Sequence, residues 1–319
     1  MIKKRFISML VLLAAVVTGA RAQWTGGTYT ATANENLGAI TVNDDATLTI
    51  NEGVTVTVTG GITVASGTLT VTGPGTLVVT GAKGNDGANG FPFGGAGGTG
   101  GVAISGNIIV QGGATVTATG GTGGNGGGGD QGGNGGNGGV AISGNIIVQG
   151  GATVTATGGN GGTGSYADGY GGNGGNGGNA FAGTLTYKSG TVTANGGSGG
   201  SGGYGEEAEG YGPSGSDGKA FANEVDFNQT TGYSVTDGTS TIESVLNQTK
   251  VVISGGTPIP TGYSVSLKSV PEDASSWQGK AGEGEYQELP LTGLEAGTAV
   301  SVKYSGTKKV KSVKAKKKQ

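Results

Sequence analysis

The sequence contains no cysteine and no histidine among its 319 residues. The absence of cysteine excludes disulfides and thiolate chemistry, and the absence of both residue types excludes the usual zinc ligand sets and histidine acid–base relays. Aromatic residues make up only 6% of the chain, so a compact globular core would be difficult to fill. Stacked strand repeats need few large side chains, because Val, Ile, Leu and Ala fill the space between successive repeats.

Arginine is nearly absent as well, since it occurs only at Arg5 and Arg21. Both lie in residues 1–22, which combine a basic start, an apolar run and small residues before a cleavage point, as in a secretory signal peptide. The apolar run, about twelve residues long, is too short to span a bilayer as a helix. We therefore expect a mature chain that begins at Gln23, has no membrane span and is secreted or held on a bacterial cell surface.

Charge is distributed unevenly along the rest of the chain. Residues 23–249 carry 15 acidic residues against three lysines, whereas residues 250–319 carry 6 acidic residues and 11 lysines. An acidic body without arginine argues against nucleic acid as its partner. The basic tail, residues 308–319, is typical of a solvated terminal segment.

One sequence cassette repeats along the middle of the chain. Residues 100–121 recur letter for letter at 138–159, and a diverged copy ends the segment 180–197. Each cassette divides into three short strands with apolar and polar residues alternating, which predicts one turn of a parallel β-helix. We expect turns at 39–60, 61–81, 102–119, 140–157, 180–195 and, more loosely, 220–235.

The predicted fold is therefore all-β. It is a right-handed parallel β-helix over residues 23–249, closed by residues 236–249, and a small β-sandwich-like domain follows at 250–307. The second part has ordinary glycine content, prolines and longer strands such as KVVIS and YSVSLKSV.

Glycine-rich excursions interrupt the predicted solenoid at 81–101, 120–139, 158–179 and 196–218. In the two middle excursions bulkier residues recur every third position with Gly-Gly between them, and a period of three belongs to the polyproline-II helix. Each excursion has bulky residues at its centre, so we expect a hairpin of two extended limbs with a turn between them. The alternative is a set of flexible loops, because glycine at this density without order is disordered.

The runs GGTGGN, GGNGGNGG and GGSGGSGG resemble polyglycine-II proteins, such as the glycine-rich adhesins of phage tail fibres and the PGRS repeats. This resemblance implies a sandwich of such helices on the β-solenoid, with outward loops that carry receptor recognition. Separately, the segment LTGLEAGTAVSVKYSGTKKVKSVKAK resembles the end of sorting domains of the type IX secretion system.

The centres of the excursions are the candidate ligand-binding sites. Aromatic rings stack on sugars or on protein surfaces, and carboxylates accept hydrogen bonds from hydroxyl groups. The candidate ligand-binding residues are Phe91, Phe93, Asp130, Tyr166, Asp168, Tyr170, Tyr204, Glu206 and Tyr211. They predict an adhesin that binds a surface glycan or a protein receptor. The alternative is that these bulky residues only turn the glycine-rich limbs.

An enzyme is not expected. The cassettes 102–119 and 140–157 contain no charged residue, and glycoside hydrolysis needs two carboxyl groups about 5–10 Å apart. The dense acidic residues, Asp44 with Asp45 and the group Glu206, Glu207 and Glu209, are typical of solvated turns. The calcium-binding nonapeptide of β-rolls requires an aspartate where the GGN triplets have asparagine, so no metal or other cofactor is expected.

A threonine array offers a different function. Alternation places the threonines of the third strand of each turn outside the solenoid, in a column. Such a regular array resembles the ice-binding surfaces of insect antifreeze proteins. Its members are Thr55, Thr57, Thr59, Thr115, Thr117, Thr119, Thr153, Thr155, Thr157, Thr191 and Thr193. Ordinary exposed strand threonines, or a passive matrix protein without a ligand, are the remaining interpretations.

Overall fold

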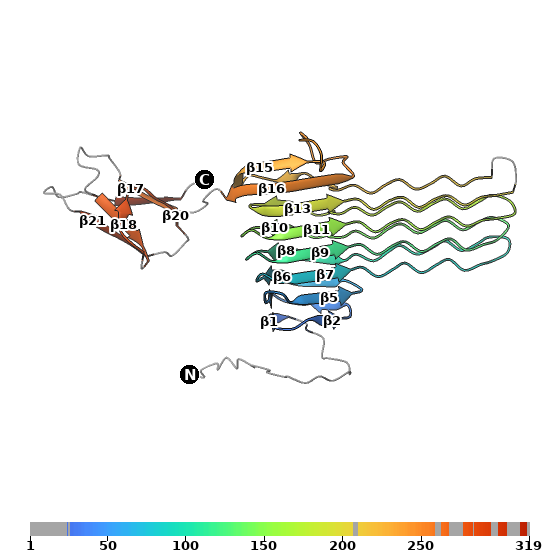
Figure 1. Ribbon diagram of the computed structural model, residues 1–319, viewed down its shortest axis with the longest axis horizontal. Coiled ribbons are helices and arrows are strands. Elements are labelled where there is room, and N and C mark those ends of the chain that lie inside the picture. Colours follow the sequence, from blue (N-terminus) through green and yellow to red (C-terminus); the bar gives the residue numbers. More distant parts are fainter. Residues whose placement is uncertain are drawn as a thin grey trace.

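The computed structural model describes residues 24, 26–206, 210–258, 263–267, 277–282, 284–294, 299–304 and 313–317. The predicted signal peptide, residues 1–22, lies outside this part, as do Glu207 and Glu209. Within it every regular element is a strand, so the all-β prediction is confirmed (Figure 1).

The first sixteen strands form two large sheets. Their bounds are β1 (Gly27–Ala31), β2 (Glu35–Leu37), β3 (Ile40–Val42), β4 (Ala46–Ile50), β5 (Thr55–Thr59), β6 (Ile62–Thr72), β7 (Thr76–Thr80), β8 (Ile104–Val110), β9 (Thr115–Thr119), β10 (Ile146–Val148), β11 (Thr153–Thr157), β12 (Leu185–Tyr187), β13 (Gly190–Asn195), β14 (Val225–Asp226), β15 (Thr230–Thr236) and β16 (Lys250–Pro258). The first sheet has the order β1-β4-β6-β8-β10-β12-β14, with β3 also paired to β6, and the second has the order β15-β16-β13-β11-β9-β7-β5-β2.

Strands from successive repeats lie side by side in parallel and in register. Val116 of β9 pairs with Val154 of β11, which pairs with Val192 of β13, at the repeat distance seen in the sequence. The chain thus returns to the same sheet position once in each repeat, a course compatible with a β-solenoid (Figure 1).

Alternation along each strand separates the core from the surface. Val116, Val154 and Val192 are fully buried, whereas the neighbouring threonines are partly exposed, as the period-two pattern predicts. The core also contains a stacked pair of rings, Phe181 and Phe221, whose centroids lie 4.9 Å apart. Small aliphatic side chains fill most of the remaining interior, which explains how so few aromatic residues suffice.

The end of the solenoid differs from the prediction in one respect. Val225 does join the first sheet in β14, but β15 does not continue the parallel stack of the second sheet. Instead β16 pairs antiparallel with β13, and β15 pairs antiparallel with β16. The reason is burial: Val251 and Ile253 of β16 are completely buried, whereas most of β15 is exposed. The solenoid sheet therefore extends to residue 258, past the predicted boundary at 249.

The C-terminal strands form two separate three-stranded antiparallel sheets. They are β17 (Tyr263–Leu267), β18 (Trp277–Ala281), β19 (Gln287–Glu288), β20 (Leu291–Leu294), β21 (Val300–Tyr304) and β22 (Val313–Lys317), in the orders β20-β17-β22 and β19-β18-β21. Part of the predicted basic tail, 308–319, is a strand, because Val313–Lys317 pairs antiparallel with β17. The alternation of Val313 and Ala315 with lysines gives this segment a strand period.

The four glycine-rich excursions run as hairpins that project from one corner of the solenoid (Figure 1). We call residues 81–90, 120–128, 158–165 and 196–203 the outgoing limbs, and residues 94–101, 131–139, 170–179 and 211–218 the returning limbs. The eight limbs together are the glycine lattice. Limbs of one direction hydrogen-bond to limbs of the same direction in the next hairpin: Gly123 N donates to Asn160 O, and Gly135 N donates to Asn173 O, both at 2.8 Å.

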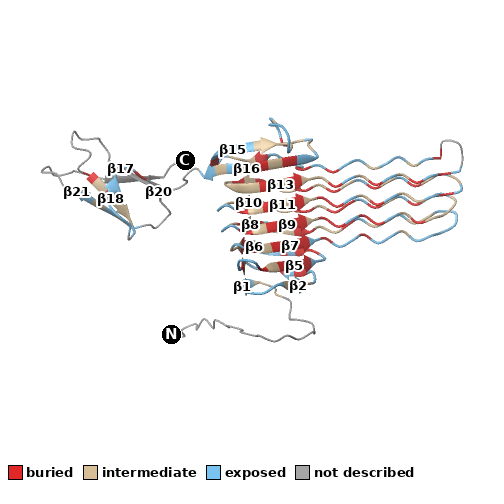
Figure 2. Ribbon diagram, viewed as in Figure 1, coloured by how far each residue is buried: buried red, intermediate tan, exposed pale blue. Residues whose placement is uncertain are grey.

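A second set of backbone hydrogen bonds joins outgoing to returning limbs. Gly124 N donates to Gly98 O of the previous hairpin, and Gly136 N donates to Gly124 O of its own hairpin, both at 2.8 Å. Each GGX triplet of an inner limb therefore uses its two glycine amides for two different neighbours. The X residue faces outward, as the alternating burial along the limbs indicates (Figure 2).

The third amide of the triplet is satisfied by asparagine side chains. Asn134 Oδ1 accepts from Asn173 N at 2.8 Å, and Asn137 Oδ1 accepts from Asn176 N at 2.9 Å. Asn125 Oδ1 accepts from Thr163 N in the same way at 3.1 Å. A side-chain carbonyl at X thus pairs the outward amide of the next hairpin, which gives the asparagine of GGN a structural role.

We predict that an added methyl group inside the lattice is strongly destabilising. A Cβ at Gly124 would lie 1.9 Å from Asn85 O, so Gly124→Ala forces backbones apart and should lower the free energy of unfolding by about 2 kcal/mol or more. Thr122→Ala, at an exposed X position of the same limb, should change it by less than about 0.5 kcal/mol. Urea unfolding followed by circular dichroism compares the two; equal effects would contradict the close packing.

Candidate functional site

The turns that connect the limbs form a row at the far end of the lattice from the solenoid (Figure 1). We call residues 90–93, 129–131, 166–170 and 204–211 tips 1 to 4; residues 90, 131, 170 and 211 belong both to a tip and to the adjoining limb. Isolated parallel bridges join successive tips, from Phe93 to Gln131, from Gly129 to Ala167 and from Ala167 to Gly205. The tips therefore stack in the register of the repeats beneath them.

The tips concentrate the exposed aromatic side chains of the molecule. Eight large hydrophobic side chains are exposed among the described residues, and six of these belong to tips. The six are Phe91, Phe93, Tyr166, Tyr170, Tyr204 and Tyr211. Tips are drawn mainly as exposed in Figure 2, whereas the limbs behind them alternate between buried and exposed residues.

Three of the predicted tyrosines meet in a row across tips 3 and 4. The rings of Tyr166 and Tyr204 stack with centroids 5.7 Å apart, and Tyr211 meets Tyr204 edge to face at 4.9 Å. Tyr204 is thus the central ring of what we call the tyrosine row. The structure shows no ring contact from Phe91 and Phe93 of tip 1, or from Tyr170, to this row within the described residues.

The predicted acidic residues also stack from tip to tip. The bridges at Gly129, Ala167 and Gly205 place Asp130, Asp168 and Glu206 at equivalent positions, each one residue further along the chain. The Tyr166 hydroxyl donates a hydrogen bond to Glu206 Oε1, and this bond raises the pKa of Tyr166 to about 12. The backbone carbonyl of Asp130 accepts from Gly169 N at 2.8 Å, which holds tip 3 against tip 2.

No basic side chain belongs to the tips in the part of the chain that the structure describes. Two lysines, Lys83 in the first limb and Lys219 directly after the last, lie where the lattice joins the solenoid, and both have partners. Lys83 pairs with Asp86 at 3.0 Å, and Lys219 donates to Asn247 Oδ1 at 2.9 Å. The tips therefore present aromatic rings, carboxylates and backbone groups.

The described residues contain no group of three or more acidic side chains close enough to hold a metal ion. Nor do they include any helix long and apolar enough to cross a membrane.

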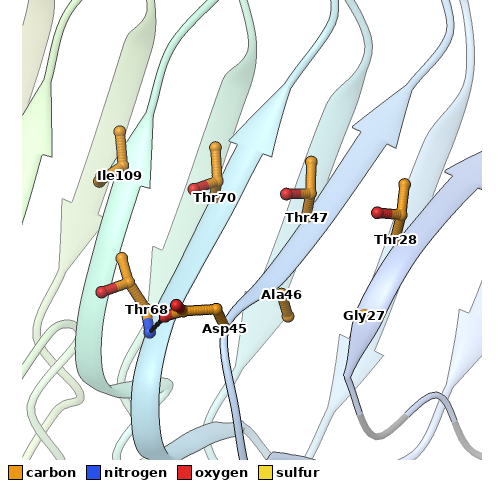
Figure 3. A pocket seen from close by; sticks show the side chains of 8 residues that line it. All are labelled: Gly27, Thr28, Asp45, Ala46, Thr47, Thr68, Thr70 and Ile109. Carbon is orange, nitrogen blue, oxygen red and sulfur yellow. Dashed lines mark hydrogen bonds between the residues drawn. The ribbon is translucent and has the colours of Figure 1, made fainter. Parts of the chain in front are cut away.

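The structure adds one surface feature that the sequence analysis did not single out. A shallow hollow of about 390 Å³ lies on the first sheet, away from the tips, and the ladder of Thr28, Thr47 and Thr70 runs through it (Figure 3). At its margin Asp45 Oδ1 accepts from Thr68 N at 2.9 Å, so this carboxylate fixes a turn. The repeated Thr-x-Thr of the second strands is the sequence signal that could have indicated this ladder.

Comparison with known proteins gives no match: no family model, no curated protein and no solved structure is similar to this chain.

We predict that the hydrogen bond to Glu206 delays ionisation of Tyr166. Because the folded-state pKa of about 12 exceeds the ordinary value of 10.0, this bond stabilises the tip below pH 10 and is lost as the pH rises through 12. The tyrosinate absorbance that Tyr166→Phe removes should have its midpoint near 12, and in the Glu206→Gln background it should move toward 10. A midpoint near 10 in the unmodified protein, with its far-ultraviolet dichroism intact, would contradict the contact.

Proposed function

We propose that this chain is an adhesin: a secreted or surface-exposed bacterial protein that binds a surface glycan or a protein receptor through its tips. One observation carries the proposal, namely that six of the eight exposed large hydrophobic side chains of the described residues lie at the tips. Exposed aromatic residues in one patch are typical of binding surfaces. In this reading the solenoid and the lattice serve to hold the patch.

The preorganisation of the tips supports the same proposal. Binding through flexible loops requires ordering of side chains and backbone, which reduces affinity. Here the tyrosine row is supported by backbone bridges between tips and by the bond from Tyr166 to Glu206. Carboxylates without neighbouring lysines favour uncharged or basic partners over acidic ones.

The proposal also includes the handedness of the solenoid and the backbone conformation of the limbs. We infer that the solenoid coils right-handed, because connections between parallel strands of one sheet nearly always have that hand. We further infer that the limbs are polyglycine-II helices, since a period of three with three sets of lateral hydrogen bonds suits that conformation. A C-terminal β-domain that directs secretion or surface attachment completes the arrangement.

Tyr204→Ala should weaken binding to a ligand found in a glycan and cell-surface screen by at least about tenfold, because it removes the central ring of the tyrosine row. Tyr286→Ala is the matched control, since Tyr286 is an exposed tyrosine in the C-terminal strands. Surface plasmon resonance with the mature protein measures both. Equal binding by both variants would reject the tips as the site, and a screen without any ligand would favour a passive matrix role.

A second candidate function, ice binding, is favoured by the outward face of the second sheet. Five successive strands, β5, β7, β9, β11 and β13, pair in register and repeat Thr-x-Thr, with Val78 and Asn195 as the departures. Rows about 4.8 Å apart carry hydroxyl groups about 6.7 Å apart along each strand. This is a flat, regular array of hydroxyl and methyl groups.

The ice-binding candidate predicts thermal hysteresis in solutions of the mature protein. Thr117→Tyr with Thr155→Tyr should abolish it, because two bulky rings interrupt adjacent rows of the array. Thr47→Tyr, on the outward face of the first sheet, is the control and should retain it. Freezing behaviour of the unmodified protein equal to that of a buffer with an inert protein would exclude this function.

A further inference from the structure

The glycine lattice has two edges, and their composition differs from that of the inner limbs. The first edge is the outgoing limb 81–90 and the last edge is the returning limb 211–218. Inner limbs have two glycines in each triplet, as in GGTGGN, except where Ser165 ends the limb 158–165, whereas the two edge limbs, GAKGNDGAN and YGPSGSDG, have one. The lattice geometry explains which glycine is replaced.

In an inner limb the two glycines face opposite neighbours. A Cβ built on Gly123, the first glycine of its triplet, would meet Gly136 O of the following limb at 2.0 Å. A Cβ built on Gly124, the second glycine, would meet Asn85 O of a preceding limb at 1.9 Å. The first position of a triplet therefore faces the limbs that follow, and the second position faces those that precede.

The edge limbs lack neighbours on one side, and the side chains appear at the matching position. The first edge has no preceding limb, and its second positions are Ala82, Asn85 and Ala88, all exposed. The last edge has no following limb, and its first positions are Tyr211, Ser214 and Asp217, which are also exposed. All six freed positions carry a Cβ atom.

The backbone of the first edge retains unused hydrogen-bonding groups. Gly121, Gly124 and Gly127 each donate a backbone hydrogen bond to a preceding limb. The equivalent amides of Ala82, Asn85 and Ala88 donate none within the described residues. The carbonyl oxygens of residues 83, 86 and 89 likewise have no preceding limb from which to accept a hydrogen bond. This edge presents a periodic row of donors and acceptors, as the edge strand of a β-sheet does.

We propose that the first edge is a latent self-association surface, and that Ala82, Asn85 and Ala88 hold it shut. The occupant it fits is the same edge of a second copy of this chain, because that edge offers the same three-residue period of donors and acceptors. The first strands of the solenoid extend beyond the first hairpin without excursions (Figure 1), and they would collide if two copies paired root to root. The second copy therefore lies with its tips beside the root of the first, and a two-fold axis relates the two copies. With glycine at the three positions the backbones can approach as closely as inner limbs do, whereas a Cβ in the middle of a limb would lie about 2 Å from a carbonyl oxygen. Ser165, at the end of an inner limb beside tip 3, is the one second position there that carries a Cβ and still donates to Gly133 O, at 3.0 Å.

At the other end of the lattice the outgoing limb 196–203, which lies beside the last edge, is partly closed within the chain, which makes that side the less suitable surface. Asp217 Oδ1 accepts from Gly199 N at 2.9 Å, in place of the carbonyl that a further hairpin would supply. Thr249 O accepts from Gly196 N at 2.7 Å. Two of the amides that would serve a following hairpin are thus already occupied within the chain.

The test is the oligomeric state of the mature protein with Ala82→Gly, Asn85→Gly and Ala88→Gly combined. The weight-average mass from sedimentation should shift toward twice the chain mass as concentration rises, while the unmodified protein stays monomeric. Amide exchange at positions 82, 85 and 88 should slow upon association. The control variant Lys83→Gly, Ala96→Gly and Thr99→Gly adds three glycines at outward positions of the same hairpin and should remain monomeric.

Each other outcome overturns the proposal. A triple variant that stays monomeric with its circular dichroism unchanged shows that the side chains are tolerated at the edge without closing it. Association without slower exchange at the three amides shows that the copies meet through another surface. Association of the unmodified protein through this edge shows that the three side chains do not close it. If the triple variant loses its fold, Asn85→Gly with Ala88→Gly opens two adjacent triplets at lower conformational cost and should associate more weakly than three glycines would.

Discussion

Close approach of bare backbone to bare backbone is the constraint on which this molecule depends. Two rows of glycine in each inner limb let amides reach carbonyls of neighbouring limbs on two sides, at 2.8 Å for Gly123 and Gly124. A single Cβ at either position would lie about 2 Å from a carbonyl oxygen. Ordering a glycine costs more conformational entropy than ordering any other residue. In the lattice this cost is offset because each limb forms several lateral hydrogen bonds at once.

The solenoid supplies what the glycine limbs cannot supply themselves. An isolated hairpin of glycine triplets has no apolar side chains to bury, and nothing in it selects one neighbour over another. The parallel strands beneath bury valine, isoleucine and alanine in register, so successive hairpins leave the same corner one repeat apart. That spacing brings Gly120 of one limb opposite Thr157 at the start of the next.

On the outer surface of the lattice close packing does not require glycine, and the side chains found there have two roles. Along the limbs the X positions carry asparagines whose side-chain oxygens pair outward amides, which completes the hydrogen bonding of the backbone. At the ends of the limbs the X positions give way to aromatic and acidic residues that no neighbour covers. On the proposed adhesin function, this arrangement separates support from recognition, because the side chains of the tips are not needed to hold the limbs together.

The sequence by itself determined the strand cassettes, their buried valines, the threonine columns and the position of each tip residue, because periods of two and three are local properties of the chain. It did not determine how the solenoid ends: the greater burial of Val251 and Ile253 made β16, and not β15, the neighbour of β13. Nor could it show that Tyr166, Tyr204 and Tyr211 form one row while Phe91 and Phe93 stand apart. Those outcomes depend on contacts between residues far apart in the chain, and only the packing of the tertiary structure decided them.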